Sequence, residues 1–253
     1  ESTALGFLAG FTGQEIKRQM ETTGIATDFI ELPGGMSRLN VKLKQMDATE
    51  INASGPILSE KNLEELRKKL SALTQGDILI LSGSLPGSVT TDIYKDLMEE
   101  VDGKGIPVIV DAIGDALLKT LPLHPFLMKP NHQELSELFD VELSTREQVI
   151  PYAGKLQKWG AQNVLVSLGG AGAVLLDQNG VVYESEVPRG KLINAVGAGD
   201  SMVAGFLAGY LEKQDFAHAF LMGMAAGSAS AFSEGLADRA TVEQLYQQLK
   251  KNS

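Results

Sequence analysis

The sequence contains no cysteine, only three histidines and a single tryptophan among its 253 residues. Without cysteine the chain can form no disulfide, no thiolate-ligated zinc or iron–sulfur site and no cysteine nucleophile. The spacing of His124, His132 and His218 matches no zinc motif. Any metal chemistry is therefore expected to involve magnesium held by carboxylates and phosphates.

Long apolar runs and clusters of positive charge are missing as well. The early apolar stretch at residues 4–11 is too short and too rich in glycine for a signal peptide or a membrane span, which predicts a cytoplasmic protein without a membrane partner. The 22 Lys and Arg residues face 32 Asp and Glu residues, giving a net charge of −10. Because such a chain repels a phosphate backbone and has no basic run, nucleic-acid binding is not expected.

From residue 59 onward the chain alternates between helix-like and strand-like patterns. Ser59 is suited to cap a helix that carries four leucines on one face, and residues 77–81 then form an apolar stretch typical of a buried strand. Alternation at this spacing predicts βαβ units and a mostly parallel sheet, which is the α/β fold class. Further helices are expected at residues 13–24, 91–101, 132–139, 146–159, 200–211, 216–232 and 241–250, and further strands at 106–110, 163–168, 173–176 and 181–183.

A different pattern interrupts the chain near residue 40. Residues 38–44 alternate between polar and apolar side chains, which is typical of a strand with one buried face. Together with residues 28–32 and 49–53, this strand predicts a small antiparallel sheet. Such a sheet is not stable alone, so it should cover the main domain as a lid or pair with a second copy of itself in a homodimer. We expect one domain over residues 1–253, with the β lid at 27–55.

The turn at residues 194–201 is the most informative segment. Gly197 and Gly199 stand just before a helical pattern, where backbone amides and the helix dipole favour an anion. The alternative is that Asp200 only caps the helix and the glycines only form the turn. The chain contains no dinucleotide-binding Gly-x-Gly-x-x-Gly, no P-loop and no Gly-x-Ser-x-Gly elbow.

Residues 129–134, Lys-Pro-Asn-His-Gln-Glu, have two interpretations. The functional interpretation rests on the resemblance of this segment to a family pattern. In the simpler interpretation Pro130 ends a strand, Asn131 caps a helix and Glu134 completes a capping box.

These segments resemble the pfkB (ribokinase-like) family of carbohydrate kinases. Residues 194–200, Asn-Ala-Val-Gly-Ala-Gly-Asp, are similar to the family signature Asp-Thr-x-Gly-Ala-Gly-Asp and depart from it at Asn194 and Ala195. Residues 129–134 match the family pattern Lys-Pro-Asn-x-x-Glu. The resemblance implies a three-layer α/β/α fold with a mostly parallel sheet and a small antiparallel β lid, and ATP-dependent phosphorylation of a sugar with Mg²⁺.

The same resemblance implies roles for individual residues. Asp200 becomes the base that accepts the proton of the substrate hydroxyl, which is chemically reasonable because phosphoryl transfer needs positioning and charge neutralisation more than covalent help. The amides of Gly197, Ala198 and Gly199 become the anion hole. Lys129 and Asn131 are assigned to ATP phosphates, and Glu134 with Asn131 to the magnesium environment. Further ATP-binding assignments fall on Ser167, Gly169, Gly172, Asn194, Met224, Ser228, Ser230 and Ser233.

The acceptor side rests on residues 37–43, Ser-Arg-Leu-Asn-Val-Lys-Leu, which resemble the Thr-Arg-x-Asn-Val-Lys strand of phosphosugar kinases. The resemblance implies that Arg38 binds the phosphate already on the sugar, with Lys42 and Ser84 beside it. The alternative for Arg38 and Lys42 is a solvated strand face. An acidic chain with an anionic substrate needs a fork-shaped cation, and this favours Arg38.

Within the family, residues 3–8, 40–43 and 51–56 look most like the bacterial 1-phosphofructokinases and next like tagatose-6-phosphate kinases. This implies conversion of fructose 1-phosphate to fructose 1,6-bisphosphate, with tagatose 6-phosphate and fructose 6-phosphate as alternative acceptors. The family's N-terminal part, with its first strand and a Gly-Gly-x-x-x-Asn turn, has no counterpart in this sequence. A non-catalytic sugar-phosphate-binding protein is therefore the alternative from another class.

Overall fold

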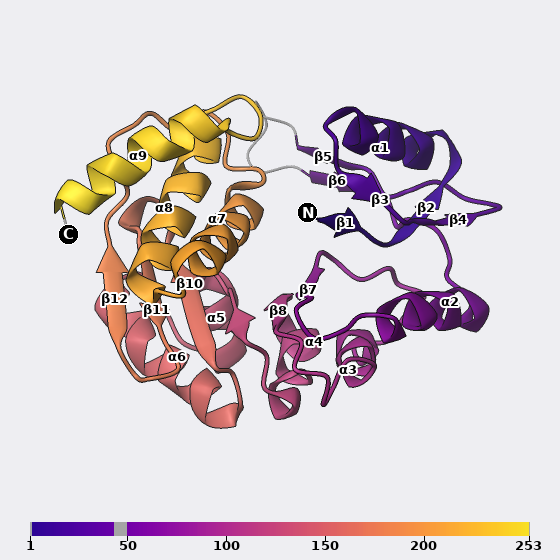
Figure 1. Cartoon of the computed structure of the whole chain (residues 1–253), viewed down its shortest axis with the longest axis horizontal. Coiled ribbons are helices and arrows are strands. Elements are labelled where there is room, and N and C mark those ends of the chain that lie inside the picture. The colour runs from indigo at the N-terminus through magenta and orange to yellow at the C-terminus, as the bar shows by residue number, and fades with distance from the viewer. Residues whose placement is uncertain (1, 43–49, 253) are drawn as a thin grey trace. The chain divides into compact units, whose positions relative to one another are not determined.

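The computed structural model in Figure 1 describes residues 2–42 and 50–252 of the chain. The chain divides into two compact units. The first unit comprises Glu1–Asp77 and Gly83–Ile106, and the second comprises Ile78–Ser82 and Pro107–Ser253.

The first unit contains short strands and helices. Its best-defined helix start is that of α2, where Ser59 and Asn62 form a reciprocal capping box, as the sequence predicted for Ser59. Leu66 and Leu70 are buried on one face of this helix. The elements of the first unit are β1 (Thr3–Ala4), β2 (Phe7–Ala9), α1 (Gly10–Thr22), β3 (Ala26–Thr27), β4 (Ile30–Leu32), β5 (Asn40–Lys42), β6 (Glu50–Asn52), α2 (Glu60–Ser71) and α3 (Ile93–Glu99).

The predicted antiparallel lid is confirmed only for one pair of strands. β5 and β6 are antiparallel, with Val41 opposite Ile51. The strand expected at residues 28–32 was assigned to this sheet wrongly, because β4 instead pairs in parallel with β2. The apolar residues of the Phe7–Ala9 segment give β4 a partner from the start of the chain, which local alternation cannot reveal.

Ser37 links α1 to the segment that leads into β5. Its hydroxyl accepts the N–H of Ala9 at 3.0 Å, and its carbonyl oxygen accepts the hydroxyl proton of Thr12 at 3.1 Å. All three residues are buried. The backbone just before Arg38 is therefore fixed to the N-terminal end of α1.

The second unit is built on a six-stranded sheet with the order β12-β11-β10-β9-β8-β7. β7 to β10 pair in parallel, whereas β11 pairs antiparallel with both β10 and β12. The β11–β12 pair is the predicted hairpin. The mostly parallel α/β fold is thus confirmed. β7, expected to be buried, lies at the edge of this sheet and has alternating burial, with Ile80 46% exposed. The strands are β7 (Leu79–Ser82), β8 (Val108–Asp111), β9 (Leu127–Met128), β10 (Asn163–Ser167), β11 (Ala173–Leu176) and β12 (Val182–Ser185).

Helices cover both faces of this sheet. The inward residues Leu165 and Leu175 pack in one core cluster with residues of the last three helices, and Gly154 of α6 lies beside Leu176 on the opposite face. Figure 1 shows α7 and α8 in front of β10 and β11 with α6 behind. The helices of this unit are α4 (Gly114–Leu118), α5 (His132–Phe139), α6 (Arg146–Trp159), α7 (Ala198–Lys213), α8 (Phe216–Ala231) and α9 (Arg239–Asn252), with 3₁₀ turns at Leu121–Leu123 and Gly169–Ala171. None of the helices in the described part of the chain has both the length and the apolar composition needed to cross a membrane.

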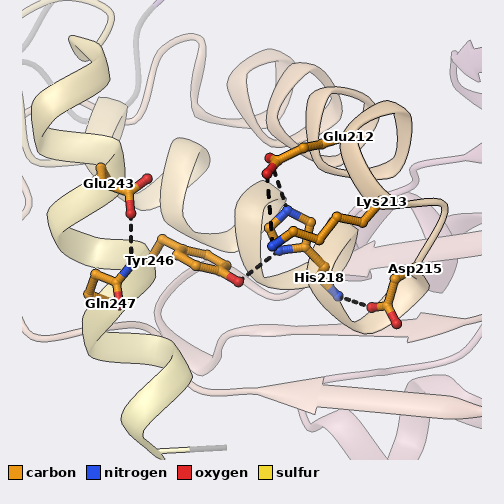
Figure 2. A network of polar contacts seen from close by, with 7 residues as sticks. All are labelled: Glu212, Lys213, Asp215, His218, Glu243, Tyr246 and Gln247. Carbon is orange, nitrogen blue, oxygen red and sulfur yellow. Dashed lines mark hydrogen bonds and ion pairs between the residues drawn. The ribbon is translucent and has the colours of Figure 1, made fainter.

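A polar network joins α9 to the C-terminal end of α7 and the N-terminal end of α8 (Figure 2). The ring of His218, which is 8% exposed, contacts the Tyr246 hydroxyl at 2.7 Å through Nδ1 and the Glu212 carboxylate at 3.2 Å through Nε2. Asp215 caps α8 by accepting the N–H of His218 at 2.6 Å. Since a carboxylate only accepts, Nε2 carries the proton toward Glu212.

Glycines bring α7 and α8 into close contact along their length. A Cβ atom at Gly205 would lie 2.6 Å from the Ala226 Cβ atom and from the Met222 carbonyl oxygen. At Gly209 it would lie 2.9 Å from the Met222 Cβ atom. On α8, a Cβ atom at Gly223 would lie 2.9 Å from the Met202 carbonyl oxygen, and one at Gly227 would lie 3.0 Å from the Ala198 carbonyl oxygen. We call this contact the glycine seam, and any side chain larger than hydrogen separates the two helices there.

We predict that Gly205→Ala lowers the free energy of unfolding by about 1–3 kcal/mol, because the added methyl group forces α7 away from α8. The matched control is Gly154→Ala on α6, where the new Cβ atom meets only Leu176 at 3.9 Å. Removing a helical glycine without crowding is expected to stabilise by about 0.5–1 kcal/mol. Urea denaturation measures both, and equal effects of the two variants would contradict the seam.

Candidate active site

The turn before α7 is open to an anion. The N-cap of α7 is Gly197, with φ of 79°, so the interpretation of Asp200 as the N-cap is wrong. Asp200 instead lies exposed in the first helical turn. The Ala198 and Ser201 amides donate to Ala195 and Gly197 carbonyl oxygens, respectively.

Two amides in the first helical turn of α7 are available for a ligand. In the part of the chain that the structure describes, the N–H groups of Gly199 and Asp200 have no hydrogen-bond acceptor. They stand at the N-terminal end of a 16-residue helix, where the partial positive charge of the helix is concentrated. This arrangement suits a phosphoryl oxygen.

A buried lysine lies beneath the same turn. Lys129 directly follows β9, is 6% exposed, and its ammonium nitrogen lies 3.2 Å from Asp111 Oδ1. A Cβ atom placed on Gly199 would lie 3.2 Å from this nitrogen, so the turn passes close to the Lys129 ammonium group. The predicted residues Lys129 and Gly199 therefore come together, although 70 positions separate them in the sequence.

Asp111 was not predicted as part of the site. Burial raises the pKa of its carboxyl group above the ordinary value, the Lys129 ammonium opposes this shift, and the negative charge of Asp200 adds to it. Asp111 therefore interacts electrostatically with both candidate residues, Lys129 and Asp200. The signal that could have revealed it is its position at the carboxyl end of β8, beside the end of β9, because the ends of neighbouring parallel strands meet at one sheet edge.

The structure confirms the capping box at Asn131 and Glu134. Asn131 Oδ1 accepts the N–H groups of Gln133 and Glu134, and Glu134 Oε2 accepts the Asn131 N–H at 2.8 Å. The box does not use Glu134 Oε1, which stays available to a cation. Among the described residues no three His, Asp or Glu side chains gather as a metal cluster. The side-chain oxygens of Asn131 and Glu134 suit Mg²⁺, which usually takes one or two carboxylates together with phosphates and water.

The turn after β10 has one structural and one open glycine. Gly172 has φ of 95°, and a Cβ atom there would lie 1.9 Å from the Ser185 carbonyl oxygen of β12. This packing is enough to require glycine at the position. Gly169 has no neighbour within 4 Å of such an atom. Ser167, at the end of β10, forms a parallel bridge with Asn131. The turn therefore lies next to the start of α5.

The residues assigned to α8 are mostly interior. Met224 is 1%, Ser228 7% and Ser230 2% exposed, and Met224 belongs to the core cluster. The Ser233 hydroxyl donates to the Ala229 carbonyl oxygen. Asn194 donates through Nδ2 to the Glu234 carbonyl oxygen at 3.1 Å and accepts the Val196 N–H through Oδ1. Their contacts with ATP stay predictions.

The residues predicted for the acceptor side belong to the first unit. Arg38 is exposed, and its Nη2 donates to Asn52 Oδ1 at 2.7 Å, a partner that the sequence did not suggest. Ser84 is exposed in the loop after β7. The Lys42 side chain lies outside the part of the chain that the structure describes. The prediction that residues 1–253 act as one kinase domain stays a prediction.

Comparisons with known proteins agree on one family. The model described as "pfkB family carbohydrate kinase" matches residues 1–242. The 1-phosphofructokinase of Bacillus subtilis (strain 168) is 45% identical over 249 residues, covering 98% of this chain and 82% of that protein. A D-tagatose-1-phosphate kinase of Bacillus licheniformis is 36% identical, covering 99% and 82%. The structure of phosphofructokinase-2 from Escherichia coli in complex with fructose-6-phosphate has a TM-score of 0.86 at 28% identity, covering 98% of this chain and 82% of that chain.

Proposed function

Because the chain belongs to the pfkB family of carbohydrate kinases, which use ATP, we propose that it phosphorylates fructose 1-phosphate to fructose 1,6-bisphosphate. The observation that carries the proposal is the turn at Gly197–Asp200, where the unused amides of Gly199 and Asp200 lie near the buried Lys129 and an exposed carboxylate. The 1-phosphofructokinase that is 45% identical supports the choice of acceptor. A cytoplasmic location belongs to the same proposal, since both proposed substrates are phosphorylated metabolites.

In the proposed step the free terminal hydroxyl oxygen of the sugar attacks the γ-phosphorus of ATP. The new P–O bond forms as the bond to the β,γ-bridging oxygen breaks, and ADP leaves with that electron pair. Asp200 accepts the hydroxyl proton, which an exposed carboxylate can do late in the transfer.

The turn and Lys129 would stabilise the charge that develops on the transferred group. The amides of Gly199 and Asp200 donate toward one locus, and they are already oriented by the helix. Lys129 adds a positive charge that burial shields from water, and Asp111 holds its ammonium group at 3.2 Å. Because these groups are fixed before the reaction, they need not reorganise during it.

Magnesium fits the oxygen donors near the start of α5. When bound, Mg²⁺ neutralises charge on the β- and γ-phosphoryl oxygens. Glu134 would hold it, directly or through water, with Asn131 beside it. The capping box keeps both side chains oriented in the absence of the ion.

We expect Asp200→Asn to lower kcat by roughly 10²–10⁴-fold, because the amide cannot accept the proton. Since Asp200 is not the helix cap, the variant should fold normally and bind ATP with nearly unchanged affinity in calorimetry. Asp115→Asn, in the first turn of α4, is the matched control and should leave kcat unchanged. An Asp200→Asn enzyme that keeps most of the kcat would falsify the assignment of the base.

The acceptor is tested by ADP release with fructose 1-phosphate, tagatose 1-phosphate, tagatose 6-phosphate and fructose 6-phosphate. The highest kcat/KM is expected for fructose 1-phosphate. Tagatose 1-phosphate is the second candidate, because a D-tagatose-1-phosphate kinase is 36% identical over nearly the whole chain. Tight binding of a sugar phosphate without ADP release would instead support the non-catalytic alternative.

Arg38→Ala should raise the KM for the preferred sugar phosphate about ten- to a hundredfold, because a charge-assisted contact to phosphate is worth roughly 1.5–3 kcal/mol. The KM for ATP should change little. Arg18→Ala, an exposed arginine of the same unit that pairs with Glu15, is the control and should change neither. Equal increases in both KM values for the Arg38 variant would indicate that the residue only supports the strand.

We also propose that the lid forms a homodimer contact. Val41 on β5 is 45% exposed, and Leu39, which precedes β5, is 47% exposed. The apolar face that the sequence predicts as buried is therefore exposed in the single chain. Val41→Lys should shift sedimentation velocity from dimer to monomer, whereas Val182→Lys, on the exposed strand β12, should not. A wild-type chain that sediments as a monomer at micromolar concentration would contradict the lid contact.

A further inference from the structure

The glycine seam ends in a polar contact next to the candidate base. Ser201, which follows Asp200, lies in the first turn of α7, and its hydroxyl oxygen is 2.8 Å from the hydroxyl oxygen of Ser230 on α8. Either serine can be the donor. Ser230 is 2% exposed, so water does not compete for this hydrogen bond.

Ser230 has a second partner on the other side of the turn. Its hydroxyl oxygen accepts the N–H of Ala237 at 3.2 Å. A serine hydroxyl has two acceptor lone pairs and one donor hydrogen, so it can serve Ala237 and Ser201 together. One buried hydroxyl thus joins the start of α7 to the loop that follows α8.

The end of α8 and the loop after it also bind residues 193 and 194, which lead into the turn. The Asn194 amide donates from its side chain to the Glu234 carbonyl oxygen, and the backbone amides of Ile193 and Asn194 both donate to the Ala231 carbonyl oxygen. A Cβ atom on Gly197 would lie 2.9 Å from the Leu236 side chain. The turn is therefore attached before and after its glycines to the end of α8.

We propose that Ser230 is a positioning residue for the turn at Gly197–Asp200 and acts through Ser201, without touching the nucleotide. The inference rests on the proposed role of Asp200. The seam fixes the distance between α7 and α8 by close packing, but packing contacts alone give no preferred direction to the groups at its end. The directional hydrogen bond at the end of the seam fixes where the carboxylate and the two unused amides point.

The test compares Ser201→Ala, Ser230→Ala and the double variant by steady-state kinetics and thermal unfolding. A neutral hydrogen bond accounts for roughly a three- to tenfold effect, so each single variant should lose about that much kcat. Both KM values should stay within about twofold of the wild type. Because either substitution breaks the same bond, the double variant should be no slower than the slower single variant.

Thr120→Val is the matched control for loss of a buried hydroxyl. Thr120 is fully buried, and its hydroxyl donates to the Leu117 carbonyl oxygen, far along the chain from the turn. This variant should lower the unfolding temperature without lowering kcat. If Ser230→Ala does not fold, Ser201→Ala still decides the question, because Ser201 is only partly buried.

Several outcomes overturn the inference. Wild-type kcat in both single variants, or losses that multiply in the double variant, would show that the two hydroxyls do not act as a pair. A raised KM for ATP alone would place Ser230 in contact with the nucleotide. Asp200→Asn, measured in parallel, separates the two proposals. An active Asp200→Asn enzyme overturns the proposed base, whereas an inactive one beside fully active serine variants overturns only the role of Ser230.

Discussion

The candidate site depends on how closely α7 and α8 approach each other. Four glycines, Gly205 and Gly209 on one helix and Gly223 and Gly227 on the other, remove the side chains that would keep the helices apart. The close approach buries the hydroxyl of Ser230 beside Ser201 and brings the loop after α8 to the turn. Backbone amides can act as a fixed anion site only if the helix that carries them does not move, and the seam provides this rigidity.

A second constraint is the burial of charge below the turn. Lys129 is buried and Asp111 is largely buried, and each lowers the cost of burying the other. The Lys129 ammonium does not fully offset the cost of burying Asp111, because burial still raises the pKa of that carboxyl group. An anionic phosphoryl group near Lys129 would share the ammonium that Asp111 now holds. The site therefore contains a buried positive charge in a chain whose net charge is −10.

Local sequence signals predicted the elements that depend on local interactions. The bounds of α5, α6 and β11 agree with their patterns, because caps and strand turns mark them. Pairing between distant segments was not visible in the sequence, so β4 was assigned to the wrong sheet. For the same reason Asp111 and Asn52 were missed, since each becomes relevant only through a partner from another strand. The alternative interpretation of Asp200, as a helix cap, was wrong because Gly197 takes that position.

The α7–α8 hairpin also has a consequence for the entropy of ordering the site. Only Gln214 and Asp215 separate the two helices, so the contacts of the seam close short loops. Short loops lose less chain entropy on closure than the meeting of Lys129 with Gly199, which joins more distant segments. The anion-facing turn thus takes most of its order from its own stretch of sequence, and the distant strands have only to supply the charge beneath it.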